Sequence, residues 1–126
     1  MPNEKIKILL IEDDATLVEM YEMKFKESEF EILVADRGAQ GLEIAEKQVP
    51  DIILLDIILP EMDGFAILRE LKKDEKTKRI PVLLLSNLGQ DSDIEKGKKL
   101  GAEDYLVKAN YTPTQVVDMV RKYIKK

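Results

Sequence analysis

Several side chains that can bind a cation or act as nucleophiles each stand at the end of a short apolar run in this 126-residue sequence. They are Glu12, Asp13 and Asp14 after "IKILLI", Asp56 after "DIILL", Ser86 at the end of "PVLLLS" and Lys108 after "DYLV". Each residue alone has an ordinary explanation, because Asp and Ser cap helices or form turns and a single Lys is usually solvated. Their repeated placement at the ends of apolar runs predicts one shared site.

An acidic cluster of this kind needs a counter-charge. Three carboxylates about 5 Å apart repel one another by roughly 3 kcal/mol per pair at an effective dielectric constant near 20. Three such pairs approach the ~5–15 kcal/mol stability of a whole domain, so the cluster must bind a cation or keep one carboxyl group protonated. The chain has no His and no Cys, and an all-oxygen ligand set favours Mg²⁺ over Mn²⁺ or Ca²⁺. A Mg²⁺ ion beside a lysine would suit a phosphoryl group.

The composition argues against several other kinds of function. Hydrophobic residues make up 44% of the chain, which is enough for the core of one domain. The net charge of −5 argues against general binding to nucleic acid or to acidic membranes. The absence of cysteine removes disulfide and thiolate chemistry. No apolar stretch approaches the roughly 18 residues that span a bilayer, and "MPNEKIKILL" is too short and too charged for a secretory signal, so we expect a cytoplasmic protein.

Five short apolar runs predict five strands, over residues 6–11, 31–35, 51–56, 81–86 and 104–108. The first, third and fourth runs are almost continuous in Ile, Leu and Val, which is typical of parallel strands covered on both faces. The segments between the runs have helical spacing, as in "ATLVEMYEMKFKE". We expect the last helix to begin with a capping box formed by Thr112 and Gln115, with Pro113 as its first residue.

Strands and helices that alternate through short loops predict an α/β fold, a doubly wound parallel sheet with helices on both faces. Of the two common strand orders, the flavodoxin-like order 2-1-3-4-5 suits five strands and five helices best. Ligands of such sheets bind beyond the carboxyl ends of the strands. The first, third, fourth and fifth strands are neighbours in this order, so the acidic cluster, the hydroxyl group and the lysine should meet in one crevice.

The sequence resembles the receiver domain of two-component response regulators. The resemblance rests on "LLIEDD", "DIILLDIILPEMDG", "LLLSN" and "GAEDYLVKA", in the family's order and spacing, and it covers essentially the whole chain. It implies one receiver domain over residues 1–126, most similar to single-domain regulators of the chemotaxis type. It also implies a phosphorylation-activated signalling switch and not an enzyme, because such a domain catalyses only its own phosphorylation and dephosphorylation.

By this resemblance Asp56 is the phosphoacceptor, which takes a phosphoryl group from the phosphohistidine of a histidine kinase or phosphotransfer protein in a Mg²⁺-dependent reaction. The same motifs imply the roles of the other site residues. They are Glu12, Asp13 and the backbone carbonyl of Ile58, which with Asp56 would bind Mg²⁺ or its substitute Mn²⁺, Lys108, which would contact a phosphate oxygen, and Ser86 and Tyr105, which would form the switch. Asp14 has two interpretations, N-cap of the first helix or metal ligand, and we favour the cap.

The sequence departs from the family's pattern at several positions near this site. Ala109 follows the lysine where the family often has proline after a cis bond, and a cis bond before Ala would cost roughly 3–4 kcal/mol. The direction in which Lys108 points is therefore open. Ser86 replaces the commoner threonine and keeps the hydroxyl group. Ile58 and Leu88 stand at positions that flank the phosphoryl group in this family, and we expect their branched side chains to hinder an attacking water.

The resemblance further implies two kinds of partner. A histidine kinase or phosphotransfer protein would supply the phosphoryl group, and a downstream protein would bind the face formed by the fourth helix, fifth strand and fifth helix. The domain would be a monomer or a phosphorylation-dependent dimer, without direct binding to nucleic acid or membranes.

Three other classes of function fit the sequence less well. A Mg²⁺-dependent phosphatase or phosphotransferase with an aspartyl-phosphate intermediate usually carries a second acid two residues after the nucleophile, where this chain has Ile58. A phosphorylation-silent binding scaffold would have no need of every site residue. A flavin carrier would need a phosphate-binding loop rich in glycine or hydroxyl groups after the first strand, and none is present.

Overall fold

A computed structural model describes residues 5–124 as alternating strands and helices. The elements are β1 (Lys7–Ile11), α1 (Ala15–Glu27), β2 (Glu31–Ala35), α2 (Gly38–Gln48), β3 (Ile52–Leu55), α3 (Gly64–Lys73), β4 (Val82–Ser86), α4 (Asp91–Lys99), β5 (Asp104–Val107), a 3₁₀ helix η1 (Lys108–Asn110) and α5 (Pro113–Ile124). All strand pairs are parallel, in the order β2-β1-β3-β4-β5. The predicted flavodoxin-like fold is confirmed, and each predicted strand lies within one residue of the observed one at both ends.

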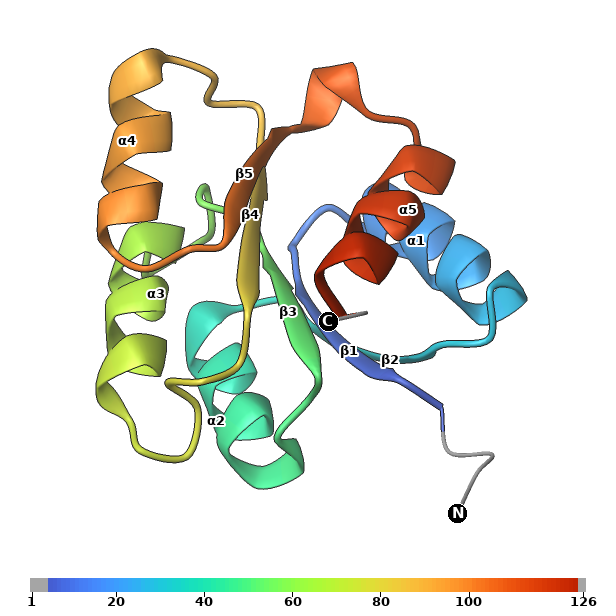
Figure 1. Cartoon of the computed structure of the whole chain (residues 1–126), viewed down its shortest axis with the longest axis horizontal. Coiled ribbons are helices and arrows are strands. Elements are labelled where there is room, and N and C mark those ends of the chain that lie inside the picture. The colour runs from blue at the N-terminus through green and yellow to red at the C-terminus, as the bar shows by residue number, and fades with distance from the viewer. Residues whose placement is uncertain (1–4, 125–126) are drawn as a thin grey trace.

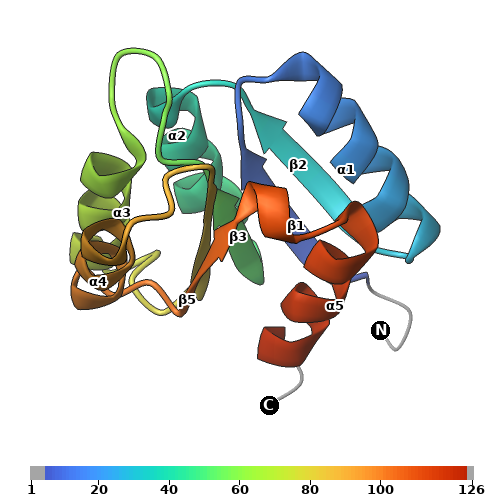
Figure 2. The same ribbon diagram turned by 90° about the horizontal axis from the view of Figure 1, so that it is seen from above.

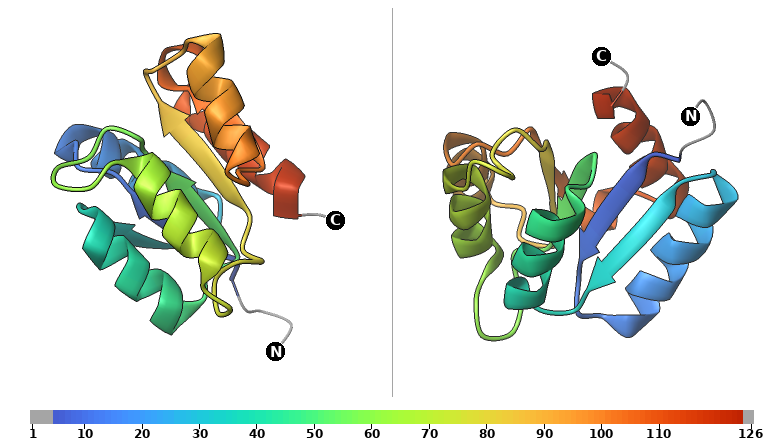
Figure 3. Two further views of the ribbon diagram at one scale, coloured as in Figure 1. Left: turned by 90° about the vertical axis from the view of Figure 1, so that its left-hand side faces the viewer. Right: turned by 90° about the horizontal axis from the view of Figure 1, so that it is seen from below.

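The helices cover both faces of the sheet (Figure 1). Helices α1 and α5 lie together on one face, whereas α2, α3 and α4 lie on the other (Figure 2). The right-hand view of Figure 3 shows the same division, with α2 and α1 on opposite sides of β1 and β2. The site loops therefore emerge from a sheet that is shielded from water on both sides.

The strand sequences explain this arrangement, because alternate residues of one strand enter different halves of the core. In β1, Leu9 and Ile11 pack in the cluster under α2, α3 and α4. Ile8 and Leu10 pack in the cluster under α1 and α5. Strands β3 and β4 are buried at every position, so the nearly continuous apolar runs do mark strands covered on both faces.

Three helices begin with side-chain caps beside the carboxyl ends of the strands. The Asp14 carboxylate accepts hydrogen bonds from the backbone N–H groups of Thr16 and Leu17, which confirms it as the N-cap of α1. Asp63 caps α3 in the same way. The capping box of α5 is also confirmed, because the N–H of Thr112 donates to Gln115 Oε1 at 2.8 Å and the N–H of Gln115 donates to Thr112 Oγ1 at 3.2 Å. These caps fix where the site loops end.

Helix α4 approaches the sheet closely through its one glycine. A Cβ atom on Gly97 would lie 2.4 Å from Cδ1 of Leu84 in β4, so a larger residue would require the Leu84 side chain or the helix to shift. The ammonium group of Lys96 lies 4.5 Å from the ring centroid of Phe65 in α3 and adds a cation–π contact. Glycine therefore has a packing reason in a helix that it would otherwise weaken.

Among residues 5–124, no helix combines the length and hydrophobicity that crossing a membrane requires.

Val49 is in an unfavourable backbone conformation, and this predicts a stabilising substitution. It ends α2 with φ 44° and ψ 68°, a left-handed conformation that β-branched residues rarely adopt, and it is 52% exposed. We expect Val49→Gly to raise the free energy of unfolding by about 1 kcal/mol, because the relieved strain exceeds the entropy that glycine adds to the unfolded chain. Urea denaturation would measure the change. The exposed Ala39 in the same helix is a control, since Ala39→Gly should destabilise by about 1 kcal/mol.

Candidate functional site at the carboxyl edge of the sheet

Two carboxylates are buried at the carboxyl ends of neighbouring strands. Glu12 follows β1 and is 1% exposed, and Asp56 follows β3 and is 5% exposed. Their backbones extend the sheet by one residue, because the N–H of Asp56 donates to the carbonyl of Ile11 at 3.0 Å and the N–H of Glu12 donates to that of Ala35 at 2.9 Å. The ladder of the sheet thus fixes the positions of both acidic residues.

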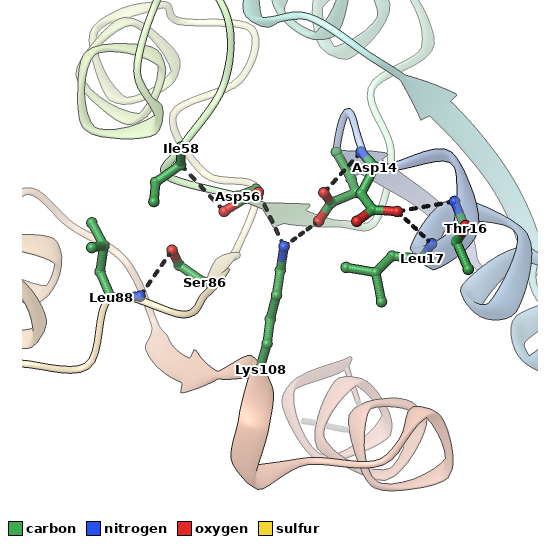
Figure 4. A network of polar contacts seen from close by, with 9 residues as sticks. Asp14, Thr16, Leu17, Asp56, Ile58, Ser86, Leu88 and Lys108 are labelled. Atoms are coloured by element: carbon green, nitrogen blue, oxygen red, sulfur yellow. Dashed lines mark hydrogen bonds and ion pairs between the residues drawn. The ribbon is translucent and has the colours of Figure 1, made fainter.

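Lys108 connects these two carboxylates. Its ammonium group lies 2.7 Å from Glu12 Oε1 and donates to Asp56 Oδ2 at 3.1 Å (Figure 4). The lysine begins η1, directly after β5, and its side chain is only 11% exposed. Residues 5–124 contain no cis peptide bond, so the bond between Lys108 and Ala109 is trans. The direction in which Lys108 points was left open because proline is absent after it. With a trans bond, the ammonium group of Lys108 still reaches the carboxylate of Asp56.

Burial and charge shift the pKa values of Glu12 and Lys108. Burial raises the pKa of the Glu12 carboxyl group, the contact with Lys108 opposes this, and the negative charge of Asp56 adds to it. Burial by itself would lower the pKa of the Lys108 ammonium group, but its contacts with Glu12 and Asp56 outweigh burial and raise it. The lysine is therefore held in its charged form.

The site fits a hard divalent cation. Oxygen atoms of Glu12, Asp13 and Asp56 lie within 4.8 Å of one another, and Asp13 is exposed to solvent. Within the described part of the chain, the buried Oε1 atom of Glu12 accepts no hydrogen bond of ordinary geometry, so it keeps a lone pair for a further positive charge beside Lys108. One lysine does not neutralise three carboxylates. Oxygen ligands with an open, hydrated side are what Mg²⁺ prefers.

Ser86 and Tyr105 meet at the backbone of Leu88. Ser86 ends β4, is fully buried, and its Oγ accepts a hydrogen bond from the N–H of Leu88 at 3.3 Å (Figure 4). The Tyr105 hydroxyl group donates to the carbonyl oxygen of the same Leu88. Burial is the main cause that raises the pKa of Tyr105, to about 12, with a further contribution from the charge of Asp93. Both residues therefore hold the loop between β4 and α4.

The loop after Asp56 folds back on the strand that carries it. The N–H of Gly64 donates to the carbonyl of Ile57 at 2.7 Å. A Cβ atom on Gly64 would lie 2.3 Å from the carbonyl oxygen of Asp56 and 2.6 Å from the Cα of Ile57. Asp63 caps α3 and Gly64 is its first residue, and the close approach of Gly64 to the backbone of Asp56 is a role that the sequence alone did not reveal. The N–H of Ile58 donates to Asp56 Oδ1 at 3.3 Å, and the side chain of Ile58 is 58% exposed.

The structure brings together most residues that the sequence singled out. Glu12, Asp13, Asp56 and Lys108 form one charged group. Ser86 lies beside Asp56 (Figure 4). The contacts that sequence reasoning missed involve backbone atoms. They are the hydrogen bond from the Tyr105 hydroxyl group to the carbonyl oxygen of Leu88 and the close approach of Gly64 to the backbone of Asp56. Residue type gives no signal for either.

The fold and the charged edge of the sheet fit a receiver domain. The protein-family model described as "Response regulator receiver domain" matches residues 8–121. The chain therefore belongs to the family of response regulator receiver domains.

Sequence similarity to known proteins supports this assignment. Protein PilH of Pseudomonas aeruginosa PAO1 is 36% identical over 104 residues, which are 81% of this chain and 84% of PilH. The DNA-binding dual master transcriptional regulator RpaA of Synechocystis is 36% identical over 116 residues, which are 92% of this chain but 46% of RpaA. The chain spans about half the length of several such curated relatives.

One similar solved structure contains a bound metal ion. The receiver domain of sensor histidine kinase PA1611 from Pseudomonas aeruginosa PAO1 has 27% sequence identity and a TM-score of 0.88, with 98% of this chain and 100% of that one covered. That domain has a magnesium ion coordinated in its active-site cleft. Together with the acidic cluster described above, it supports binding of Mg²⁺ by this chain.

Gly64 predicts a sensitive point of the site. We expect Gly64→Ala to destabilise the domain by about 1–3 kcal/mol and to weaken Mg²⁺ binding, because the new methyl group must displace the backbone that carries Asp56. Urea denaturation and a Mg²⁺ titration would measure both effects. Gly89→Ala is the control, since its Cβ would lie 3.5 Å from the nearest atoms of Val107, an ordinary contact. Equal Mg²⁺ affinities in the two variants would contradict the prediction.

Proposed function

We propose that this domain is a phosphorylation-activated signalling switch whose phosphoacceptor is Asp56. The observation that carries the proposal is the placement of the Asp56 carboxylate. It is 5% exposed, hydrogen-bonded to Lys108 at 3.1 Å, and within 4.8 Å of two further carboxylates at the open edge of the sheet. A nucleophile, a fixed cation and a set of hard-metal ligands thus share one position.

The proposed reaction is a transfer of a phosphoryl group from a phosphohistidine. One carboxylate oxygen of Asp56 forms a bond to phosphorus while the bond from phosphorus to the imidazole nitrogen breaks, and the imidazole leaves with that electron pair. An ionised carboxylate needs no base for this attack. Lys108 would donate to a phosphoryl oxygen from its position beside Asp56. Bound Mg²⁺, or Mn²⁺ in its place, would neutralise charge on the phosphoryl oxygens.

Four groups would hold that metal ion. They are the carboxylates of Glu12, Asp13 and Asp56 and the backbone carbonyl of Ile58. The spacing of the three carboxylates supports their part of the set, and the hydrogen bond from the N–H of Ile58 to Asp56 supports the placement of that residue beside the nucleophile.

Ser86 and Tyr105 would convert phosphorylation into a change of surface. In the proposed switch the Ser86 hydroxyl group moves toward the phosphoryl group and takes the backbone of Leu88 with it. Tyr105 is hydrogen-bonded to the same backbone and lies in β5, next to α4. The face of α4, β5 and α5 would then bind a downstream protein or a second copy of the domain.

The remaining parts of the proposal concern partners and setting. A histidine kinase or phosphotransfer protein would be the donor, residues 1–126 would form one receiver domain in the cytoplasm, and the domain would catalyse only its own phosphorylation and dephosphorylation. The exposed Ile58 stands where a phosphatase with an aspartyl intermediate would place its second acid, which favours the switch. The metal ligands and Lys108 meet at Asp56, which favours a phosphorylated domain over a silent scaffold.

The central test is intact mass after incubation with Mg²⁺ and acetyl phosphate. We expect the mass of one added phosphoryl group in the wild type, because Asp56 would displace acetate from phosphorus. Asp56→Asn and a sample with excess chelator should add none. If the wild type binds Mg²⁺ but remains unmodified, the domain is a silent scaffold and the proposal fails.

Ile58 and Leu88 predict a long-lived phosphorylated state. Ile58 is 58% exposed and Leu88 is half-buried, and both lie near Asp56 and Ser86 (Figure 4). Neither side chain can orient a water for attack on the acyl phosphate. We expect Ile58→Asn with Leu88→Glu to shorten the half-life of the phosphorylated state by about tenfold or more, since positioned polar groups assist such attack.

Decay of phosphorylated protein after removal of the donor measures this half-life. The matched control combines Ile6→Asn with Met23→Glu, two exposed apolar residues that lie outside the site loops. An unchanged half-life in the Ile58 and Leu88 variant would refute the shielding role, as would equal acceleration in the control.

A further inference from the structure

Helix α4 is held on the molecule mainly through its C-terminal half. Of its nine residues only Gly97 is buried, whereas α3 contributes five buried residues and α5 contributes three. The start of α4 has no side-chain cap, because Gln90 makes no capping hydrogen bond, in contrast to Asp14 before α1 and Asp63 before α3. The N-terminal end of α4 is therefore the end that can follow a movement of the loop before it.

The C-terminal half of α4 lies against the first turn of α3 (Figure 1). The ammonium group of the exposed Lys96 lies 4.5 Å from the ring centroid of Phe65. A Cβ atom on the next residue, Gly97, would lie 3.8 Å from Cε1 of the same ring. Within residues 5–124 no carboxylate forms an ion pair with Lys96, so its charge contacts the ring of Phe65 instead.

Phe65 is fixed to the backbone that carries Asp56. Its side chain is only 7% exposed and packs in the core cluster under α2, α3 and α4. The residue before it, Gly64, donates its N–H to the carbonyl of Ile57 at 2.7 Å, and a Cβ atom on Gly64 would lie 2.3 Å from the carbonyl oxygen of Asp56. The ring is therefore a fixed point, and a movement of α4 relative to the sheet changes the position of Lys96 over it.

We propose that Lys96 is a positioning residue whose contact with Phe65, here called the α4 latch, favours the unphosphorylated arrangement and opposes phosphorylation of Asp56. The inference rests on the proposed function and adds the regulation of its site. In that function Leu88 follows Ser86 toward the phosphoryl group, and the start of α4 follows Leu88. Such a short helix moves as one body, so the movement draws Lys96 away from the fixed ring.

The α4 latch should have a measurable thermodynamic effect on the site. A contact that stabilises one arrangement of α4 lowers the affinity for any group that favours the other arrangement, and the two effects are equal in free energy. The cation–π contact of an exposed lysine is modest in strength. We therefore expect the α4 latch to weaken binding of a phosphoryl group by about threefold.

The first test measures binding of beryllium trifluoride, an equilibrium mimic of a phosphoryl group on a carboxylate, by ¹⁹F NMR at saturating Mg²⁺. Lys96→Met removes the charge but keeps a long side chain, and it should bind the mimic about threefold more tightly than the wild type. Lys96→Arg should retain wild-type affinity, because a guanidinium group also stacks on aromatic faces. The control is Lys99→Met, which changes another exposed lysine of the same helix and should also retain wild-type affinity. Equal affinities of the two methionine variants would overturn the inference.

The second test asks whether Lys96 acts through the ring. Phe65→Leu keeps a buried apolar side chain but removes the aromatic face, and urea denaturation verifies that the variant is folded. In the Phe65→Leu background Lys96→Met should leave the affinity for beryllium trifluoride unchanged, because the partner of the charge is already gone. The same tightening in both backgrounds would show that Lys96 does not act through Phe65, and the inference would fail.

Failure of the proposed function gives a different result. A wild type that binds Mg²⁺ but neither beryllium trifluoride nor a phosphoryl group from acetyl phosphate would refute the switch at Asp56. The α4 latch is then decided by urea denaturation of the wild type, the Lys96→Met and Phe65→Leu variants and the double variant. Coupled changes in the free energy of unfolding would support a contact that holds α4, whereas purely additive changes would overturn it.

Discussion

Two buried carboxylates share one lysine at the edge of this sheet, and the rest of the site depends on that arrangement. Glu12 and Asp56 are almost inaccessible to water, and Lys108 reaches both of them. Removing charges from water is costly, and a buried ion pair is favourable only when its remaining polar atoms are also satisfied. Here one lysine faces two buried carboxylates and a third at the surface, so the site retains an attraction for a further cation. That residual attraction is what makes it a candidate metal centre.

The fold supplies the rigid support that such a site needs. Strands β3 and β4 are buried along their whole length between two layers of helices, and hydrogen bonds of the sheet continue past the strand ends to Glu12 and Asp56. Two helices that leave this edge start at aspartate caps, Asp14 and Asp63. The carboxylates thus stand directly at the end of the buried, hydrogen-bonded sheet, whereas the loops that surround them are largely exposed to solvent.

Much of this arrangement could be predicted from the sequence, because it depends on patterns of residue type. Apolar runs gave every strand within one residue, and the strand order placed Lys108 near Asp56 although 52 residues separate them. Contacts with backbone atoms could not be predicted, since residue type does not reveal which carbonyl a side chain will reach. The hydrogen bond from Tyr105 to Leu88 is one example. The isomer of the bond between Lys108 and Ala109 could not be predicted either. Local energy favoured the observed trans bond, whereas the family's pattern favoured cis.

Leu88 gives the proposed switch a short physical route. Its N–H donates to the Ser86 hydroxyl group at the site, and its carbonyl accepts the Tyr105 hydroxyl group from β5. One residue therefore connects the two proposed switch residues. Helix α4 begins three residues after Leu88. It packs on the sheet at Gly97, where the helix lies so close to Leu84 that there is little room for a side chain. A shift of Leu88 would therefore act on both of its hydrogen-bond partners and on the loop that leads into α4. Closely packed elements of this kind exchange between discrete arrangements and do not deform gradually, which is the behaviour that a signalling switch requires.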